Sequence, residues 1–315
     1  MQWTRPDASR LHVRWRGVLL ALLLELLATP AAAHPALWVV RDTDTTIYLF
    51  GTVHLLPHDT AWHFPALDRA LDDSQVLYLE ITDDDPAHMA ALVLQYGMDM
   101  AHPLSGLLSP FDRDRLDRAA RLAHVPGGMA ALEVMRPWLA ALTLTVAPLT
   151  QAGLDPAEGV DRQLRSRMEQ AGKPVRALET AEEQIRFLAD MPRAMQVALL
   201  RSTLRDTDRA AVDLQALIGA WRDGDEAAIA RLENASLRKD EPALYQRLLV
   251  ERNRAWAKRI AALLARPGTV FIAVGAAHLA GPDSVQVQLA RTGIAAGRKR
   301  PARRLPMQAL DSSSK

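Results

Sequence analysis

Short apolar runs and longer amphipathic segments alternate along this chain, and the order of the two predicts its elements. The runs 36–40 and 45–50 are rich in strand-forming residues and flank the polar tetrapeptide RDTD, which predicts a β-hairpin. A helix is predicted over 64–74, with Pro65 in its first turn, and a strand over 75–81. The hairpin, helix and second strand make a βαβ start.

The remaining chain is mostly helical by pattern. Successive helices broken by Pro and Gly over 84–159 predict a helical insertion or cap. Strands are expected at 175–179 and 269–274, and Thr180 with Glu183 fits a capping box that opens the next helix. The predicted fold class is therefore α/β: a central mixed sheet with an N-terminal β-hairpin, flanking helices and a helical insertion.

The first 33 residues have the layout of a secretory signal peptide. Several arginines precede the apolar run 17–28, and Ala31–Ala33 forms a cleavage site before His34. An uncleaved anchor is the weaker alternative, because the run is short for a bilayer. We expect a periplasmic or secreted protein with a single α/β domain over 34–296 and a basic, disordered tail over 297–315.

The composition excludes some functional classes but does not identify one. The 315 residues are 49% hydrophobic, so a sizeable core can form. Lys and Arg number 38 against 37 Asp and Glu, a balance that gives no sign of nucleic-acid binding. Cysteine is absent, which excludes disulfides and thiolate metal sites. No apolar stretch after the signal segment is long enough for a membrane span.

Two strand-like runs end in the same G-x-x-H pattern. TIYLFGTVHLLP (46–57) leads to His54, and TVFIAVGAAHLAGP (269–282) leads to His278. Glu80 and Glu179 also follow predicted strands. Ligands of open α/β sheets bind at the carboxyl ends of strands, and glycine before each histidine permits a sharp turn and close backbone approach. These side chains are therefore candidates for one site.

The chemistry of these residue types leaves two mechanisms open. Two neutral imidazoles and a carboxylate, His54, His278 and Glu80, can bind a divalent metal and leave a position for water. Without metal, one histidine would act as a general base oriented by the glutamate, and the other would donate to a developing oxyanion. A purely structural histidine bonded to backbone is the plain alternative. Glu179 is a weaker candidate because it directly precedes a helix.

Arg252 lies on the apolar stripe of a predicted helix, in steps of three and four residues from Tyr245 to Leu263. A guanidinium on that face needs an acidic partner such as Glu80 or an anionic substrate group; snorkelling to water is the alternative. Asn253 is placed to bond the first G-x-x-H loop. His58 and His63 lie near His54 and offer a second, weaker metal cluster.

Several blocks in order resemble the TraB/GumN family, which includes pheromone-shutdown proteins and the Tiki proteases. They are YLFGTVHLLP, LYLEI, GVDRQL…AGKPVRALET…EQ, LLVERNRAW and VGAAHLAGPDSV, and they span about 37–293. The resemblance implies a fold similar to the erythromycin-esterase and ChaN-like superfamily. It also implies metal-dependent peptide cleavage with Mn, Co or Zn, using His54, His278 and Glu80, with Arg252 in the same site.

The first functional hypothesis is thus an exported, metal-dependent hydrolase that cleaves a peptide bond. Glu80 would be a third metal ligand or the general base, and Arg252 would pair with Glu80 or hold a substrate carboxylate. Two alternatives stay open. The first is a non-catalytic periplasmic protein that captures a peptide, a haem or a metal. The second is a metal-free, esterase-like hydrolase that cleaves an ester.

Overall fold

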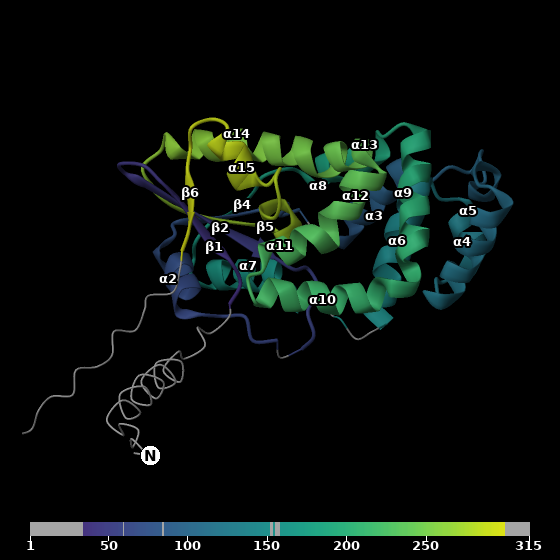
Figure 1. The fold of residues 1–315 in the computed structure, drawn as a ribbon, viewed down its shortest axis with the longest axis horizontal. Coiled ribbons are helices and arrows are strands. Elements are labelled where there is room, and N and C mark those ends of the chain that lie inside the picture. Colours follow the sequence, from purple (N-terminus) through teal and green to yellow (C-terminus); the bar gives the residue numbers. More distant parts are fainter. Residues whose placement is uncertain (1–33, 59, 84, 152–153, 155–157, 300–315) are drawn as a thin grey trace, which may run out of the picture. The chain divides into compact units, whose positions relative to one another are not determined.

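The computed structural model describes residues 34–299 except 59, 84, 152–153 and 155–157. The predicted signal peptide and residues 300–315 of the predicted tail lie outside the described residues. A six-stranded sheet has the order β4-β3-β5-β2-β1-β6 (Figure 1). Its strands are β1 (Leu37–Arg41), β2 (Thr45–Thr52), β3 (Val76–Leu79), β4 (Val175–Ala177), β5 (Gly268–Gly275) and β6 (Ala296–Arg298).

The sheet is mixed, as predicted. Strands β4, β3, β5 and β2 run parallel, and β1 is antiparallel to both β2 and β6. The tight turn between β1 and β2 is closed by Asp42, whose Oδ1 accepts hydrogen bonds from the backbone N–H groups of Asp44 and Thr45 at 3.2 and 2.8 Å. This Asx-type turn confirms the predicted hairpin.

Helices surround the sheet and continue beyond it (Figure 1). They are α2 (Pro65–Asp73), α3 (Pro86–Gly97), α4 (Pro110–Leu122), α5 (Gly128–Glu133), α6 (Pro137–Gln151), α7 (Val160–Gln170), α8 (Ala181–Ala189), α9 (Arg193–Asp206), α10 (Ala210–Arg222), α11 (Glu226–Ile229), α12 (Ala235–Asp240), α13 (Pro242–Tyr245), α14 (Glu251–Leu264) and α15 (Val285–Ala290). Two π-helical turns, Ala230–Asn234 and Gln246–Val250, precede α12 and α14. None of the helices in the described ranges is both long and apolar enough to cross a membrane.

Both faces of the sheet are covered, which explains why β5 reads as a continuous apolar run. Phe271 and Ala273 pack into a core with side chains of α2, α7 and α10. The alternate residues Ile272 and Val274 face a second core with α14 and α15. The α/β fold class with flanking helices is therefore confirmed.

The region predicted as a helical insertion holds α3 to α6. Its apolar residues build cores of their own: α4, α5 and α6 pack with α9 around Leu116, Leu132 and Leu200. At the other end of the chain, Gly297 and Arg298 belong to β6 and pair with β1, so the sheet takes in the first residues of the segment expected to be a disordered tail.

The parallel register of β2 and β5 sets the two G-x-x-H turns side by side. Gly51 pairs with Val274, and Thr52 pairs with Gly275. A Cβ atom on Gly51 would lie 3.0 Å from Cα of Ala276 in the second turn. The first glycine is therefore required by close approach of backbone, because any side chain would push the turns apart.

We predict that Gly51→Ala lowers the free energy of unfolding by about 1–3 kcal/mol, because a methyl group has no room against the backbone of Ala276. Gly219→Ala in α10 is the matched control: nothing lies within 4 Å of its added methyl, and helix propensity makes the change neutral or stabilising. Urea denaturation of both variants checks this. Equal stabilities would contradict the packing argument.

Candidate active site

Four polar side chains follow the carboxyl ends of the four parallel strands. His54 follows β2, His278 follows β5, Glu80 follows β3 and Glu179 follows β4. Parallel strands end at the same edge of a sheet, so a shared direction brings these side chains together. Arg252 reaches the same edge from α14.

The space above Cα of Gly275 shows how closely the predicted residues approach. A Cβ atom built there would lie 3.2 Å from Glu80 Oε1, 3.7 Å from His278 Cδ2 and 3.8 Å from His54 Nε2. The backbone N–H of Gly275 also donates to Glu80 Oε1 at 2.7 Å. Two imidazoles more than two hundred positions apart in the chain therefore meet at one carboxylate.

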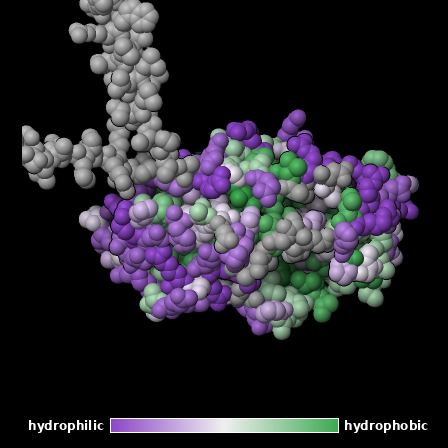
Figure 2. Space-filling view, turned by 90° about the horizontal axis from the view of Figure 1, so that it is seen from below, coloured by the Kyte–Doolittle hydropathy of each residue, from purple (hydrophilic) through white to green (hydrophobic). Residues whose placement is uncertain are grey.

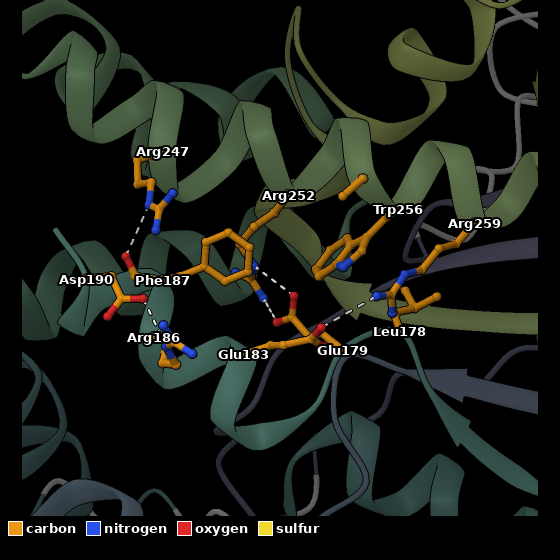
Figure 3. Close-up of a pocket in the computed structure, with 11 residues that line it drawn as sticks. Leu178, Glu179, Glu183, Arg186, Phe187, Asp190, Arg247, Arg252, Trp256 and Arg259 are labelled. Atoms are coloured by element: carbon orange, nitrogen blue, oxygen red, sulfur yellow. Dashed lines mark hydrogen bonds and ion pairs between the residues drawn. The ribbon is translucent and has the colours of Figure 1, made fainter. Parts of the chain in front are cut away.

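Arg252 bridges two buried carboxylates. Its Nη2 donates to Glu80 Oε2 at 2.8 Å and to Glu179 Oε1 at 2.5 Å, and Figure 3 shows the contact with Glu179 behind the Phe187 ring. The side chains of Arg252, Glu80 and Glu179 are 13%, 11% and 4% exposed. Gln184 Nε2 donates to both carboxylates, at 3.2 and 3.0 Å. Glu179, the weaker candidate in the sequence, thus belongs to the network.

The protonation of Glu80 and His278 follows from these contacts. Burial alone would raise the pKa of Glu80, but attraction from His278, Arg252 and His54 and the Gly275 hydrogen bond lower it to about 2. Burial lowers the pKa of His278 to about 4. At neutral pH Glu80 is ionised and His278 is neutral.

His278 is held as one tautomer. Its Nδ1 lies 2.6 Å from Asn253 Oδ1, and an amide oxygen only accepts, so Nδ1 carries the proton. Nε2 then has the lone pair and accepts from Arg252 Nη1 at 3.2 Å. Asn253 was expected to bond the first G-x-x-H loop. It bonds the second, because its Nδ2 donates to the carbonyls of His278 and Asp283 at 3.4 and 2.8 Å.

His54 is tied to a different partner. Its Nδ1 lies 3.1 Å from Asp161 Oδ1, and this hydrogen bond, with the negative charges of Asp161 and Glu80, raises the pKa of His54 to about 9. Its side chain is 62% exposed. Both histidines therefore have Nδ1 fixed by an oxygen, and His54 Nε2 lies toward the space beside Glu80.

Three residues that contribute to the site are not predicted from the sequence. Asn234 donates to the carbonyls of Ala277 and Ala280 at 3.1 and 3.3 Å and so clamps the turn that carries His278. It reaches them from a π-helical turn, a feature found often at functional sites and one that apolar periodicity does not reveal. Asp161 and Gln184 lie in the quoted family blocks, but nothing in their spacing marks them as partners of His54 and Glu80.

A pocket of about 260 Å³ opens beside this network, lined by Thr52, His54, Glu80, Asp161 and Gln184 among others. The Thr52 hydroxyl is buried and has no hydrogen-bond partner among the described residues. A buried hydroxyl without a partner costs free energy.

The donor set fits a divalent metal in its chemistry but is not arranged as a closed ligand cluster. In the described ranges, no three His, Asp or Glu side chains are placed to hold a metal together, and Arg252 hydrogen-bonds the donor atoms of both His278 and Glu80. The fixed Nδ1 atoms nevertheless match the oxygen-to-histidine support usual around metal ligands. His58 and His63 pair separately with Glu158 and Asp68, so they add no second cluster.

Comparison with known proteins agrees with this arrangement of motifs. The TraB/PrgY/gumN family matches residues 36–298, nearly the whole described part of the chain. The chain belongs to the TraB/PrgY/gumN family. It is 28% identical over 261 residues to the uncharacterized protein YbaP of Escherichia coli strain K12, covering 81% of this chain and 92% of that protein, and the same figures hold for YbaP of Shigella flexneri. No solved structure gives a significant match.

We predict that Arg252→Met lowers the free energy of unfolding by about 3–5 kcal/mol, because two buried carboxylates of this TraB-family fold lose their cation. Adding Glu80→Gln and Glu179→Gln should restore part of the loss. Arg259→Met on the same helix, whose pair with Glu183 is long and exposed, should change stability by less than about 1 kcal/mol. An Arg252→Met protein as stable as the parent would contradict the charge balance described.

Stability of the metal-free protein should fall as the pH falls from 6.5 toward 2. His278 has a folded pKa of about 4 against 6.5, and Glu80 has about 2 against 4.5. In both windows the unfolded chain binds the extra proton, so acid favours unfolding by up to about 1.4 kcal/mol per pH unit for each group. The raised pKa of His54 acts oppositely: its contribution is complete below 6.5 and is lost as the pH rises through 9.

Urea denaturation in chelator at a series of pH values measures this dependence. The slope between pH 6.5 and 4 should shrink in His278→Gln and stay unchanged in His88→Gln, which alters an exposed histidine. A slope that is the same in His278→Gln and in the parent protein would show that His278 is not the group responsible.

Proposed function

We propose that this protein is an exported hydrolase that cleaves a peptide bond with the help of a divalent metal ion. The observation that carries the proposal is the convergence of two imidazoles, each bonded to an oxygen through Nδ1, on the Glu80 carboxylate beside a pocket. The peptide as substrate class rests on the resemblance of the motifs to the Tiki proteases.

Nε2 of His54, Nε2 of His278 and the Glu80 carboxylate would hold the metal. When bound, such an ion polarises a carbonyl and lowers the pKa of its water. Glu80 is ionised and His278 is neutral, which are the forms that ligate. His54, whose pKa is about 9, would have to release its Nε2 proton when the ion binds. Glu179 remains as a partner of Arg252, so the guanidinium stays neutralised when Glu80 or His278 turns to another ligand.

The surrounding residues supply binding and charge. Arg252 lies beside Glu80 and presents a guanidinium that can stabilise negative charge on an attacked carbonyl. The Asn234 and Asn253 clamps keep His278 in place, which preorganises the site.

A second candidate is metal-free hydrolysis, and the contact between Arg252 Nη1 and His278 Nε2 favours it. In that arrangement the lone pair on His278 Nε2 accepts the hydrogen bond from the Arg252 guanidinium. His54, with a pKa of about 9, would be the general acid that protonates the leaving group. Metal dependence of the activity separates the two candidates.

Export is supported by the basic, apolar and small-residue order of residues 1–33. Intact-mass measurement of the protein recovered from a periplasmic fraction should show a chain that begins at His34. A mass that includes residues 1–33, or protein confined to the cytoplasm, would contradict this part of the proposal.

The catalytic proposal predicts that His54→Ala, His278→Ala and Glu80→Gln each reduce hydrolysis of a peptide library by at least about a hundredfold, while circular dichroism stays that of a folded protein. Exhaustive chelation should abolish the activity, and Mn²⁺, Co²⁺ or Zn²⁺ should restore it. Calorimetric titration with the same ions should show binding that the three variants lose. His88→Ala is the control and should behave like the parent.

Activity that survives chelation but is lost in His54→Ala would favour the metal-free candidate. Full activity in both histidine variants would refute a reaction centre at this site. Both outcomes are decided by the same set of purified proteins.

A further inference from the structure

A second hollow lies on the other side of Arg252, in the groove between α8 and α14. Its volume is about 340 Å³, and Figure 3 shows the residues that line it. One wall carries Glu183, Arg186, Phe187 and Asp190, which share one face of α8. The other carries side chains of α14 and of the π-helical turn before it.

This groove is continuous with the proposed active site. Arg252 and Glu179 line it, and the same two side chains bond each other and contact Glu80 through Arg252 Nη2. A substrate group in the groove therefore lies against the network that holds Glu80.

The inner part of the groove is apolar and aromatic. Leu178, Phe187, Ala255 and Trp256 line it, and Arg252 lies over the Trp256 ring at 4.7 Å and near the Phe187 ring at 5.8 Å. Trp256 is only 1% exposed, so Phe187, which is half-buried, is the ring that a ligand in the groove can reach. Such walls favour a large apolar side chain, and the Phe187 ring adds a contact with an aromatic one.

Arginine side chains line the rim of the groove, and the acidic residues near them already have hydrogen-bond partners. Glu183 closes the capping box of α8 by accepting from the backbone N–H of Thr180 at 2.8 Å, and Asp190 is bonded to Arg186 at 3.0 Å. Among the described residues, Arg247 makes two long polar contacts, an ion pair with Glu251 at 3.4 Å and a hydrogen bond to the Phe187 carbonyl at 3.4 Å. Its guanidinium lies over the Phe187 ring at 5.2 Å, so it is held in position with donors that a carboxylate can use.

We propose that this groove binds the carboxyl-terminal residue of a peptide substrate. A large apolar side chain packs against Phe187 and Ala255, and the carboxylate is bound by Arg247. The inference rests on the proposed hydrolase function and deepens it: the substrates are peptides that end in a bulky apolar residue.

Calorimetric titration of the full chain in chelator with three small probes tests the groove without any need for catalysis. N-acetyl-phenylalanine has the ring and the carboxylate, N-acetyl-phenylalaninamide lacks the charge, and N-acetylglycine lacks the ring. We expect the first to bind with a Kd on the order of 1 mM and the other two at least about tenfold more weakly.

Variants assign the binding to the groove. Arg247→Gln should remove the preference for the acid over the amide, and Phe187→Ala should weaken both phenylalanine probes. Arg254→Gln, an exposed arginine of α14 outside the groove, should change nothing. Equal binding of acid and amide, equal binding of N-acetylglycine, or a loss in Arg254→Gln as large as in Arg247→Gln would overturn the proposal.

Failure here is distinguishable from failure of the proposed function. His278→Ala should lose hydrolysis and keep probe binding. If the parent hydrolyses peptides but binds the three probes alike, the substrate class is wrong and the hydrolase stands.

Discussion

The site depends on one buried cation held between two buried carboxylates. Arg252 bonds Glu80 and Glu179 at once, and each of the three side chains is almost removed from solvent. Burying any one of them alone would be prohibitive. Together they also form a mutual constraint, since the guanidinium has a fixed planar fork and can satisfy both acids only if β3, β4 and α14 lie where they do. The same network explains why Glu80 stays ionised in an apolar setting.

The second constraint is geometrical and comes from the backbone. Parallel pairing of β2 and β5 sets Thr52 beside Gly275, and each turn leaves room for the other. Gly51 faces Ala276, and Gly275 faces Glu80 and both imidazoles. Neither glycine has a positive φ, so their role is close approach and not an unusual backbone conformation. The repeated G-x-x-H pattern is thus the sequence signature of two turns packed directly together.

Much of this arrangement can be predicted from the sequence, because the sequence signals for it are local. The hairpin at Asp42, the capping box of Thr180 with Glu183 and the apolar run of β5 each depend on neighbouring residues, and the apolar stripe around Arg252 correctly predicted a guanidinium paired with Glu80. The hydrogen-bond partners of the two histidine turns lie far away in the chain, so local patterns do not predict them. Asp161 reaches His54 across 107 positions and Asn234 reaches the His278 turn across more than forty, and two π-helical turns alter the helical phase on which periodicity relies. Asn253 shows the limit well: its place beside Arg252 indicated a role in the site, but the choice between two similar turns needed the tertiary structure.

The position of Arg252 links the two hollows of the molecule. The pocket of His54 and Glu80 lies on one side of its network, and the groove of Phe187 and Trp256 lies on the other. Gln184 lines the first pocket and bonds both carboxylates, so the wall between the hollows consists of charged and amide groups in contact. A negatively charged group that binds beside Arg252 in the groove must change the electrostatic field at Glu80. The reason is that Coulomb interactions between buried charges are weakly screened. A substrate end bound in the groove as proposed would therefore be coupled to the charge of Glu80 through a single guanidinium.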